Sequence, residues 1–211
     1  MTTFADRYDA GQRLVPVLED RHERDQVILG LPCGGVPVAF EIARALHAPL
    51  DVIVVRKLGV PRQPEYAMGA IGEGGVRVFD PDVVARAGVS EGVAREVERR
   101  ERNVLEARIE SLRRGRPRVS LRGRVALIVD DGIATGSTAH AACLVARDQG
   151  AVHVVVVSPA APAGITADDL TADELICHEM PWAFGAVGNF YRDFSPTTDE
   201  EVRTLLDAAT W

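Results

Sequence analysis

Two neighbouring carboxylates and a cluster of small polar residues follow one apolar run of the chain. The run Val125–Val129 ends in Asp130 and Asp131, and the sequence TGST follows at residues 135–138, ahead of small helix-forming residues. The free N–H groups at the start of a helix, together with three hydroxyls, can hold a phosphate dianion. Carboxylates next to them can accept hydrogen bonds from sugar hydroxyls. The pattern therefore predicts a site for a sugar phosphate.

Other motifs account for this segment less well. A P-loop needs a lysine directly after Gly136, where this chain has Ser137, and the dinucleotide-binding pattern GxGxxG is absent from the sequence. An isolated Asp–Asp pair could be a metal site, or a helix N-cap followed by a turn residue. The complete order of apolar strand, two aspartates, TGST and helix favours the functional interpretation.

The surrounding sequence alternates between short apolar runs and helical patterns, which is typical of an α/β fold with a mostly parallel sheet buried on both faces. We expect one domain over residues 1–211. The predicted strands cover residues 26–31, 50–57, 76–79, 124–131, 152–159 and 173–178. The predicted helices cover residues 7–21, 36–47, 90–114, 137–149 and 200–209, with Ser90 as the N-cap of the third. Residues 58–75 are rich in glycine and proline and are expected to form a long loop.

Composition limits the class of protein. Hydrophobic residues make up 46% of the 211 residues and the formal net charge is −7, as in an ordinary globular protein. No apolar run reaches the roughly 18 residues that a membrane span requires, and the first residues contain acids rather than an apolar signal core. The three cysteines, Cys33, Cys143 and Cys177, form no CxxC pair. They indicate neither a zinc site nor a disulfide framework, so we expect a cytoplasmic protein.

Charge is unevenly distributed. Eleven arginines and five glutamates lie between Arg95 and Arg124. This segment is either a basic face for RNA or a solvated helix whose charges pair at helical spacing. A stripe of apolar residues that includes Val97, Leu105 and Leu112 favours the paired helix.

Several segments together resemble a known family. VALIVDDGIATGST resembles the binding signature for 5-phosphoribosyl 1-diphosphate (PRPP) in type I phosphoribosyltransferases. LPCGGVPVA, VVRKLGVPRQPEYAMGAIGEGG and AFGAVGNFYRDF resemble a subgroup of bacterial phosphoribosyltransferases whose acceptor is not assigned. The resemblance implies a mostly parallel twisted sheet flanked by helices. It also implies a flexible loop at about 58–75, a helical insertion at about 90–114 and a C-terminal hood at about 179–196.

The resemblance further implies roles for individual residues. Asp130 and Asp131 would bind the ribose hydroxyls, directly or through Mg²⁺, and act in catalysis. The 5-phosphate would be held by Ala134, Thr135, Gly136, Ser137 and Thr138. Pyrophosphate would be bound by Arg56, by Lys57 and by the backbone amides of Cys33, Gly34 and Gly35, next to a non-proline cis peptide.

Lys57 is the only lysine of the chain and the catalytic candidate on that strand, with Arg56 as its equal alternative. Gly34 and Gly35 also fit a plain tight turn. In the hood, Phe190, Tyr191, Arg192 and Asp193 are candidates for contact with the acceptor. Trp182, Phe184, Phe190 and Tyr191 could stack on a planar acceptor, and core packing is the preferred interpretation for most of them.

Two positions depart from the family pattern. Cys33 stands where related sequences often have arginine, so that a pyrophosphate contact is lost or supplied from elsewhere. A nucleophilic role for Cys33 lacks a recognisable histidine partner. Ala134 resembles the adenine and uracil enzymes, whereas FYRDF resembles the hood ending of the 6-oxopurine enzymes, so the acceptor base is not assigned.

The function expected from these residues is Mg²⁺-dependent transfer of a 5-phosphoribosyl group from PRPP to a nitrogenous acceptor, with release of pyrophosphate. The resemblance implies a homodimer whose partners are small molecules rather than a membrane or nucleic acid. The alternative is a regulator on the same fold that senses PRPP or a nucleotide and binds RNA through its arginines.

Overall fold

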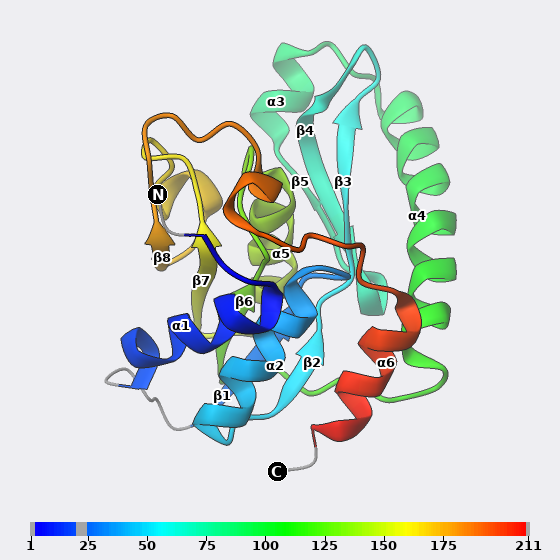
Figure 1. Ribbon diagram of the computed structural model, residues 1–211. Coiled ribbons are helices and arrows are strands. Elements are labelled where there is room, and N and C mark those ends of the chain that lie inside the picture. The colour runs from blue at the N-terminus through cyan, green and yellow to red at the C-terminus, as the bar shows by residue number, and fades with distance from the viewer. Residues whose placement is uncertain (1–2, 20–24, 210–211) are drawn as a thin grey trace.

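A five-stranded parallel sheet forms the centre of the protein in a computed structural model that describes residues 3–19 and 25–209 (Figure 1). The strand order is β2-β1-β6-β7-β8 and every neighbouring pair is parallel. The strands are β1 (Gln26–Gly30), β2 (Leu50–Val52), β6 (Val125–Val129), β7 (His153–Ala160) and β8 (Glu174–Glu179). The α/β class and the parallel sheet predicted from the sequence are confirmed.

The apolar runs become strands because both faces of this sheet are buried. All five residues of β1 and of β6 are buried, and successive side chains point to opposite faces. Ile28 and Leu127 belong to one apolar cluster, and Val27 and Ile128 belong to another on the opposite face. Uniform apolar character is what a strand covered on both faces requires.

Helices cover the two faces. On one face lie α1 (Arg7–Glu19), α2 (Gly35–Leu46) and, beside α2, α6 (Asp199–Ala208). On the other lies α5 (Ser137–Asp148). Short 3₁₀ turns are found at η1 (Glu73–Gly75), η2 (Asp168–Leu170) and η3 (Val187–Phe190). The end of the first predicted helix, at Arg21, lies outside the described residues.

The segment expected as a long loop is instead mostly a β-hairpin. The predicted strand 50–57 divides, so that β2 joins the parallel sheet while β3 (Val55–Val60) pairs with β4 (Gln63–Gly72). With β5 (Arg77–Phe79) they form a separate antiparallel sheet, whose strands rise above the parallel sheet in Figure 1. The loop prediction for residues 58–75, which followed from the glycines and prolines of this segment, is wrong because most of these residues lie in β3 and β4. A Cβ at Gly69 would lie 2.3 Å from the carbonyl oxygen of Val78, so glycine there permits close strand pairing.

The long predicted helix is confirmed as α4 (Glu91–Arg113). Its N-cap is Ser90, whose Oγ accepts a hydrogen bond from the N–H of Val93 at 3.4 Å. A short helix, α3 (Pro81–Arg86), was not predicted and begins after an Asp80 cap. In Figure 1, α4 stands along the β3–β4 hairpin, and contacts join it to β3 and to α6.

The strand order reverses between β1 and β6. From β1 the chain crosses through α2 to β2 on one side, and from β6 it crosses through α5 to β7 on the other. Open parallel sheets bind ligands outside the carboxyl ends of the strands at such a switch point. The turns after β1 and β6 are therefore the place to look for a site.

Candidate functional site

The turn after β1 lies against the end of β6. The N–H of Leu31 donates to the carbonyl oxygen of Val129 at 2.9 Å, and the Pro32–Cys33 peptide bond is cis. A Cβ at Gly34 would lie 1.9 Å from Oδ2 of Asp131, and one at Gly35 would lie 2.3 Å from the oxygen of Val129. Only glycine allows this approach, and it brings the two turns of the predicted site into contact.

One of the three amides expected to bind pyrophosphate is already used. The N–H of Gly35 donates to the carbonyl oxygen of Leu31 at 3.0 Å, which closes the turn and starts α2. The amides of Cys33 and Gly34 therefore stay as candidates, and that of Gly35 does not.

Asp130 and Asp131 lie at the carboxyl end of β6, both half-buried. The N–H of Asp130 continues the sheet by donating to the oxygen of Val157 at 3.1 Å. Asp131 accepts a hydrogen bond from Nε of Arg7 at 2.8 Å, and its backbone oxygen accepts one from the hydroxyl of Tyr191 at 2.6 Å. The pair is thus fixed at the switch point by residues from α1 and from the hood.

The electrostatics of the two carboxyls are unequal. Burial, followed by the charge of the neighbouring Asp131, raises the pKa of Asp130 well above its ordinary value. Asp131 has Arg7 as a cationic partner, and the side chains of this ion pair are only 16% and 10% exposed. A carboxyl with a raised pKa beside a paired carboxylate is typical of a functional site.

The residues predicted to form a phosphate cradle lie at the start of α5. Gly136 is its N-cap at φ +76°, and a Cβ there would lie 2.7 Å from Cδ2 of Leu170 and 2.8 Å from Cδ1 of Ile165, so both the backbone conformation and the packing require glycine. The hydroxyls of Thr135 and Ser137 lie 3.0 Å apart, and Ala134, Thr135 and Thr138 are exposed. All five predicted residues lie at this helix start, where N–H groups without intrahelical partners and three hydroxyls are candidates for binding a phosphate.

A cavity of about 420 Å³ lies next to this cradle. Its lining comes from the turn after β1 and from the facing elements, and includes Leu31, Pro32, Arg56, Arg108, Thr138 and Asp199. Thr138 belongs to both the cradle and the cavity. Two larger cavities, of about 690 and 710 Å³, lie between the end of α4 and α6 and at the hairpin tip, away from the paired aspartates.

Of the two basic residues on β3, Arg56 lines the cavity. Its Nη2 also pairs with Glu101 of α4 at 2.7 Å. Lys57 is the next residue along the strand, so its side chain projects from the opposite face of β3. Of the two candidates for binding pyrophosphate in this cavity, the position of the side chain therefore favours Arg56 over Lys57.

Cys33 contacts charged residues from two helices. Nη2 of Arg108 in α4 contacts its Sγ, and Asp199 at the start of α6 lies 3.6 Å from the same atom. Asp199 also pairs with Arg108 and accepts a hydrogen bond from the hydroxyl of Ser111. Burial raises the pKa of the Cys33 thiol, which leaves it neutral near pH 7.

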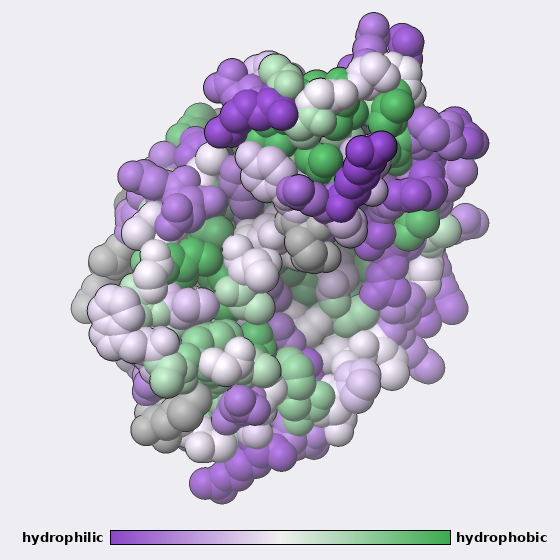
Figure 2. All heavy atoms as spheres, turned by 90° about the horizontal axis from the view of Figure 1, so that it is seen from above, coloured by the Kyte–Doolittle hydropathy of each residue, from purple (hydrophilic) through white to green (hydrophobic). Residues whose placement is uncertain are grey.

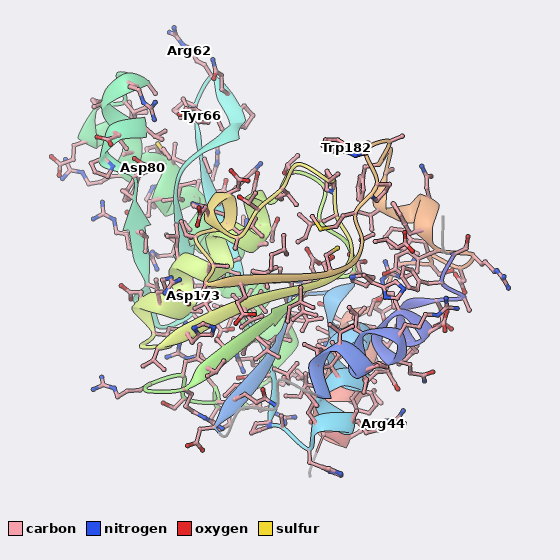
Figure 3. All side chains as sticks on the ribbon, turned by 90° about the vertical axis from the view of Figure 1, so that its left-hand side faces the viewer. Arg44, Arg62, Tyr66, Asp80, Asp173 and Trp182 are labelled. Atoms are coloured by element: carbon pink, nitrogen blue, oxygen red, sulfur yellow. The ribbon has the colours of Figure 1, made fainter. Side chains whose placement is uncertain are left out.

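The hood residues divide into buried and exposed groups. Phe184, Phe190 and Tyr191 are 8%, 0% and 7% exposed and pack with Phe4, as the preference for core packing predicted. Trp182 is 91% exposed and projects from the outer part of the hood loop (Figure 3). Arg192 and Asp193 are exposed.

Mg²⁺ fits the donor set that the switch point offers. Among the described residues, no group of three histidine, cysteine or acidic side chains is placed to hold a metal ion. Mg²⁺ keeps several waters and binds through one or two carboxylates together with substrate phosphates, so it does not need such a group. Asp130 and Asp131 supply two neighbouring carboxyls, and a divalent cation would offset the repulsion that raises the pKa of Asp130.

Three residues of the site were not predicted. Arg7 and Asp199 begin helices far from the motifs in sequence, and Arg108 is one of many arginines in α4. No local pattern distinguishes Arg7 or Arg108 from other helix-surface arginines. The Cys33 departure was the one signal, since it left open whether a contact is lost or is supplied from another part of the chain.

The arginine-rich segment consists largely of ion pairs. At least eight of its eleven arginines lie within 4.0 Å of an acid: Arg95, Arg99, Arg100, Arg102, Arg108, Arg113, Arg116 and Arg118. Arg113 is buried and pairs with Asp51 and Glu73. The pairing fits the solvated-helix interpretation of the sequence and does not favour an RNA-binding face.

Figure 2 views the carboxyl edge of the parallel sheet from above and shows a surface hollowed near its middle, with hydrophilic residues along the flank over α4.

None of the helices in the described part of the chain combines the length and apolar character needed to cross a membrane.

Comparison with known proteins gives three results. A family model described as the phosphoribosyl transferase domain matches residues 15–192. Curated proteins named "Putative phosphoribosyl transferase" from two strains of Mycobacterium tuberculosis are 53% identical over 210 residues, which are 99% of this chain and 47% of theirs. The chain thus spans about half the length of these relatives. The crystal structure of TT1426 from Thermus thermophilus is 41% identical and has a TM-score of 0.90, over 97% of this chain and 98% of that one.

Proposed function

The chain belongs to the phosphoribosyl transferase domain family, and from this premise we propose that it transfers a 5-phosphoribosyl group from PRPP to a nitrogenous acceptor and releases pyrophosphate. One observation carries the proposal. The paired aspartates, the phosphate cradle and the turn after β1 meet at the switch point of the sheet, where Gly34 lies directly against Asp131.

Each part of PRPP has a matching group in this arrangement. The 5-phosphate binds the N–H groups and hydroxyls of residues 134–138, because a helix N-terminus favours a dianion. Asp130 and Asp131 accept hydrogen bonds from the ribose hydroxyls, and Arg7 fixes the rotamer of Asp131. Pyrophosphate occupies the cavity next to Thr138, beside Arg56 and Pro32. The candidate amides of Cys33 and Gly34 follow Pro32 in the same turn.

The chemistry follows from this placement. The bond from ribose C1 to the pyrophosphate oxygen breaks as the acceptor nitrogen approaches, so positive charge develops on the sugar and negative charge on the leaving group. Fixed donors around the pyrophosphate stabilise that negative charge in the transition state. Mg²⁺, when bound with PRPP, would supply further stabilisation of the same charge.

The β3–β4 hairpin excludes water from the site, and the hood selects the acceptor. The hairpin tip, where Figure 3 shows Arg62 and Tyr66, stands clear of the parallel sheet, and we propose that it closes over bound PRPP to limit hydrolysis. The acceptor, a purine or pyrimidine base, lies beneath the hood near the exposed side chains of Arg192 and Asp193.

Titration calorimetry of PRPP with and without Mg²⁺ tests the proposal. We expect binding that needs Mg²⁺ and that weakens at least tenfold in the Asp130→Asn/Asp131→Asn variant, because the ribose hydroxyls and the cation lose their carboxylate partners. The matched control is Asp168→Asn/Asp169→Asn, which removes the same charge from a second adjacent pair that is exposed on η2. Equal affinity of the two variants for PRPP would refute the assigned roles. If the wild-type protein binds PRPP, nucleobases can then be screened as acceptors by measuring the release of pyrophosphate.

A further inference from the structure

The turn after β1 has no charged side chain of its own, and Arg108 contacts this turn at Cys33. Cys33 is at the centre of that turn, and its thiol stays neutral near pH 7 because burial raises its pKa. The guanidinium of Arg108 reaches the sulfur of Cys33 from α4, a helix 75 residues further along the chain. A permanent positive charge is thus delivered to the turn from outside it.

The cavity connects this charge to the phosphate cradle. Arg108 lines the same space of about 420 Å³ as Arg56 and Thr138, and Thr138 belongs to the first turn of α5. A group held by the N–H donors of that turn therefore has both guanidinium groups within the adjoining space. Guanidinium offers several N–H donors in one plane, a geometry that matches phosphate oxygens.

The neighbours of Arg108 hold it in place without removing it from solvent. Asp199 pairs with its Nη1 and is itself fixed by the hydroxyl of Ser111. The hydrogen bond from Ser111, with the charge of Arg108, keeps the pKa of Asp199 below its usual value, so the carboxylate stays ionised as an anchor. The side chain of Arg108 remains 35% exposed, which leaves part of the guanidinium open to a ligand.

From this geometry we infer that Arg108 binds the diphosphate group of the substrate and of the released pyrophosphate, with Asp199 and Ser111 as positioning residues. The inference rests on the proposed function and adds a residue from the helical insertion α4 to the site. It also explains how a chain with cysteine at position 33 retains a cation at this turn.

The test compares two ligands of which only the first contains a diphosphate group: inorganic pyrophosphate with Mg²⁺, and ribose 5-phosphate. We expect Arg108→Ala to weaken pyrophosphate and PRPP binding by about 10- to 100-fold in titration calorimetry, and to leave ribose 5-phosphate affinity within about twofold of wild type. Arg108→Gln removes the charge but retains a hydrogen-bond donor toward Asp199, and serves if the alanine variant folds poorly. The matched control is Arg116→Ala, which removes another ion pair between the end of α4 and α6, at Asp207, outside this cavity.

The outcomes separate the inference from the proposed function. Unchanged pyrophosphate affinity in a folded Arg108 variant overturns the inference alone, since wild-type PRPP binding would still stand. Equal losses for pyrophosphate and ribose 5-phosphate, with a lower melting temperature, would assign Arg108 a structural role and also overturn it. A wild type that binds neither PRPP nor ribose 5-phosphate contradicts the proposed function itself.

Discussion

Replacing Gly34 by alanine should disrupt the junction between the two turns of the site. The backbone of Gly34 is in the ordinary right-handed region, at φ −63° and ψ −34°, so alanine causes no backbone strain there. The difficulty is space, because the new Cβ would lie 1.9 Å from Oδ2 of Asp131 and 3.0 Å from Nε of Arg7. Real Cβ atoms do not approach closer than 3.0 Å, so the carboxylate must move by about 1 Å or more.

That displacement separates an ion pair. Nε of Arg7 lies 2.8 Å from the carboxylate, while its Nη1 donates to the oxygen of Ser195 at 2.7 Å and its guanidinium lies 4.1 Å from the ring of Phe194. Arg7 is therefore held from two other sides and cannot follow Asp131. Loss of a hydrogen bond between charged groups costs about 1.5–3 kcal/mol, and alanine restores about 0.4–1 kcal/mol by restricting the unfolded chain.

The free energy of unfolding should fall by about 1–2 kcal/mol in Gly34→Ala, which for a chain of this size lowers the melting temperature by about 2–8 °C. PRPP affinity should fall at least tenfold because Asp131 is displaced. Urea unfolding and calorimetry measure the two effects. Gly92→Ala is the control, since its Cβ would meet nothing within 4 Å near the start of α4 and should stabilise the protein slightly. A Gly34→Ala protein as stable as wild type, with unchanged PRPP affinity, would refute the reasoning.

Two further predictions concern buried charge. The pKa of Asp130 is raised to about 8 from 3.8. PRPP affinity should therefore increase as the pH rises toward about 9, because the carboxyl ionises. Calorimetry at several pH values should show that Asp130→Asn flattens this dependence of affinity on pH. Because the pKa of Asp130 is higher in the folded than in the unfolded state, its contribution to the free energy of unfolding falls as the pH rises from about 4 to about 8, by at most ~1.4 kcal/mol per pH unit. Urea unfolding of Asp130→Asn should lack this decrease. Arg113→Met should lower the free energy of unfolding by about 3–5 kcal/mol because it leaves Asp51 buried without its cation and leaves Glu73 to the more distant Arg118, at 3.8 Å. Arg116→Ala, at a more exposed pair, should cost about 1 kcal/mol or less, and equal losses in urea unfolding for the two arginine variants would contradict the role given to burial.

The sequence was most informative where local chemistry determines structure. Val125–Thr138 contains the strand, both carboxylates and the helix start in one continuous stretch, so the strand and the helix start could be predicted without knowledge of the fold. The hairpin was missed because Gly69 and Gly72 look like loop residues, yet each faces a neighbour too close for a Cβ, Val78 and Val145 respectively. Whether glycine marks a turn or a close contact depends on what packs against it, and the local sequence does not contain that information.

The same limit applies to the site. Arg7 and Arg108 reach the site from helices whose sequence signals concern only their own amphipathic pattern, and their partners lie 124 and 91 residues away. Such contacts follow from the way in which helices pack on the sheet. At Cys33 the sequence shows only that a charge is missing, and it leaves open whether the contact is lost or supplied by another part of the chain.

The hydrogen bond between Arg7 and the C-terminal end of the hood also has a consequence for biosynthesis. Arg7 donates to the oxygen of Ser195, 188 residues later, and Phe4 exchanges backbone hydrogen bonds with Phe190 and Arg192. At about 5–20 residues per second, a ribosome needs roughly 10–40 s to synthesise the interval between these partners. During that time α1 and β6 can pack together, but Arg7 cannot yet form its hydrogen bond with Ser195. The proposed sugar-phosphate site is therefore completed late on the nascent chain, after the segment around residue 195 has left the exit tunnel.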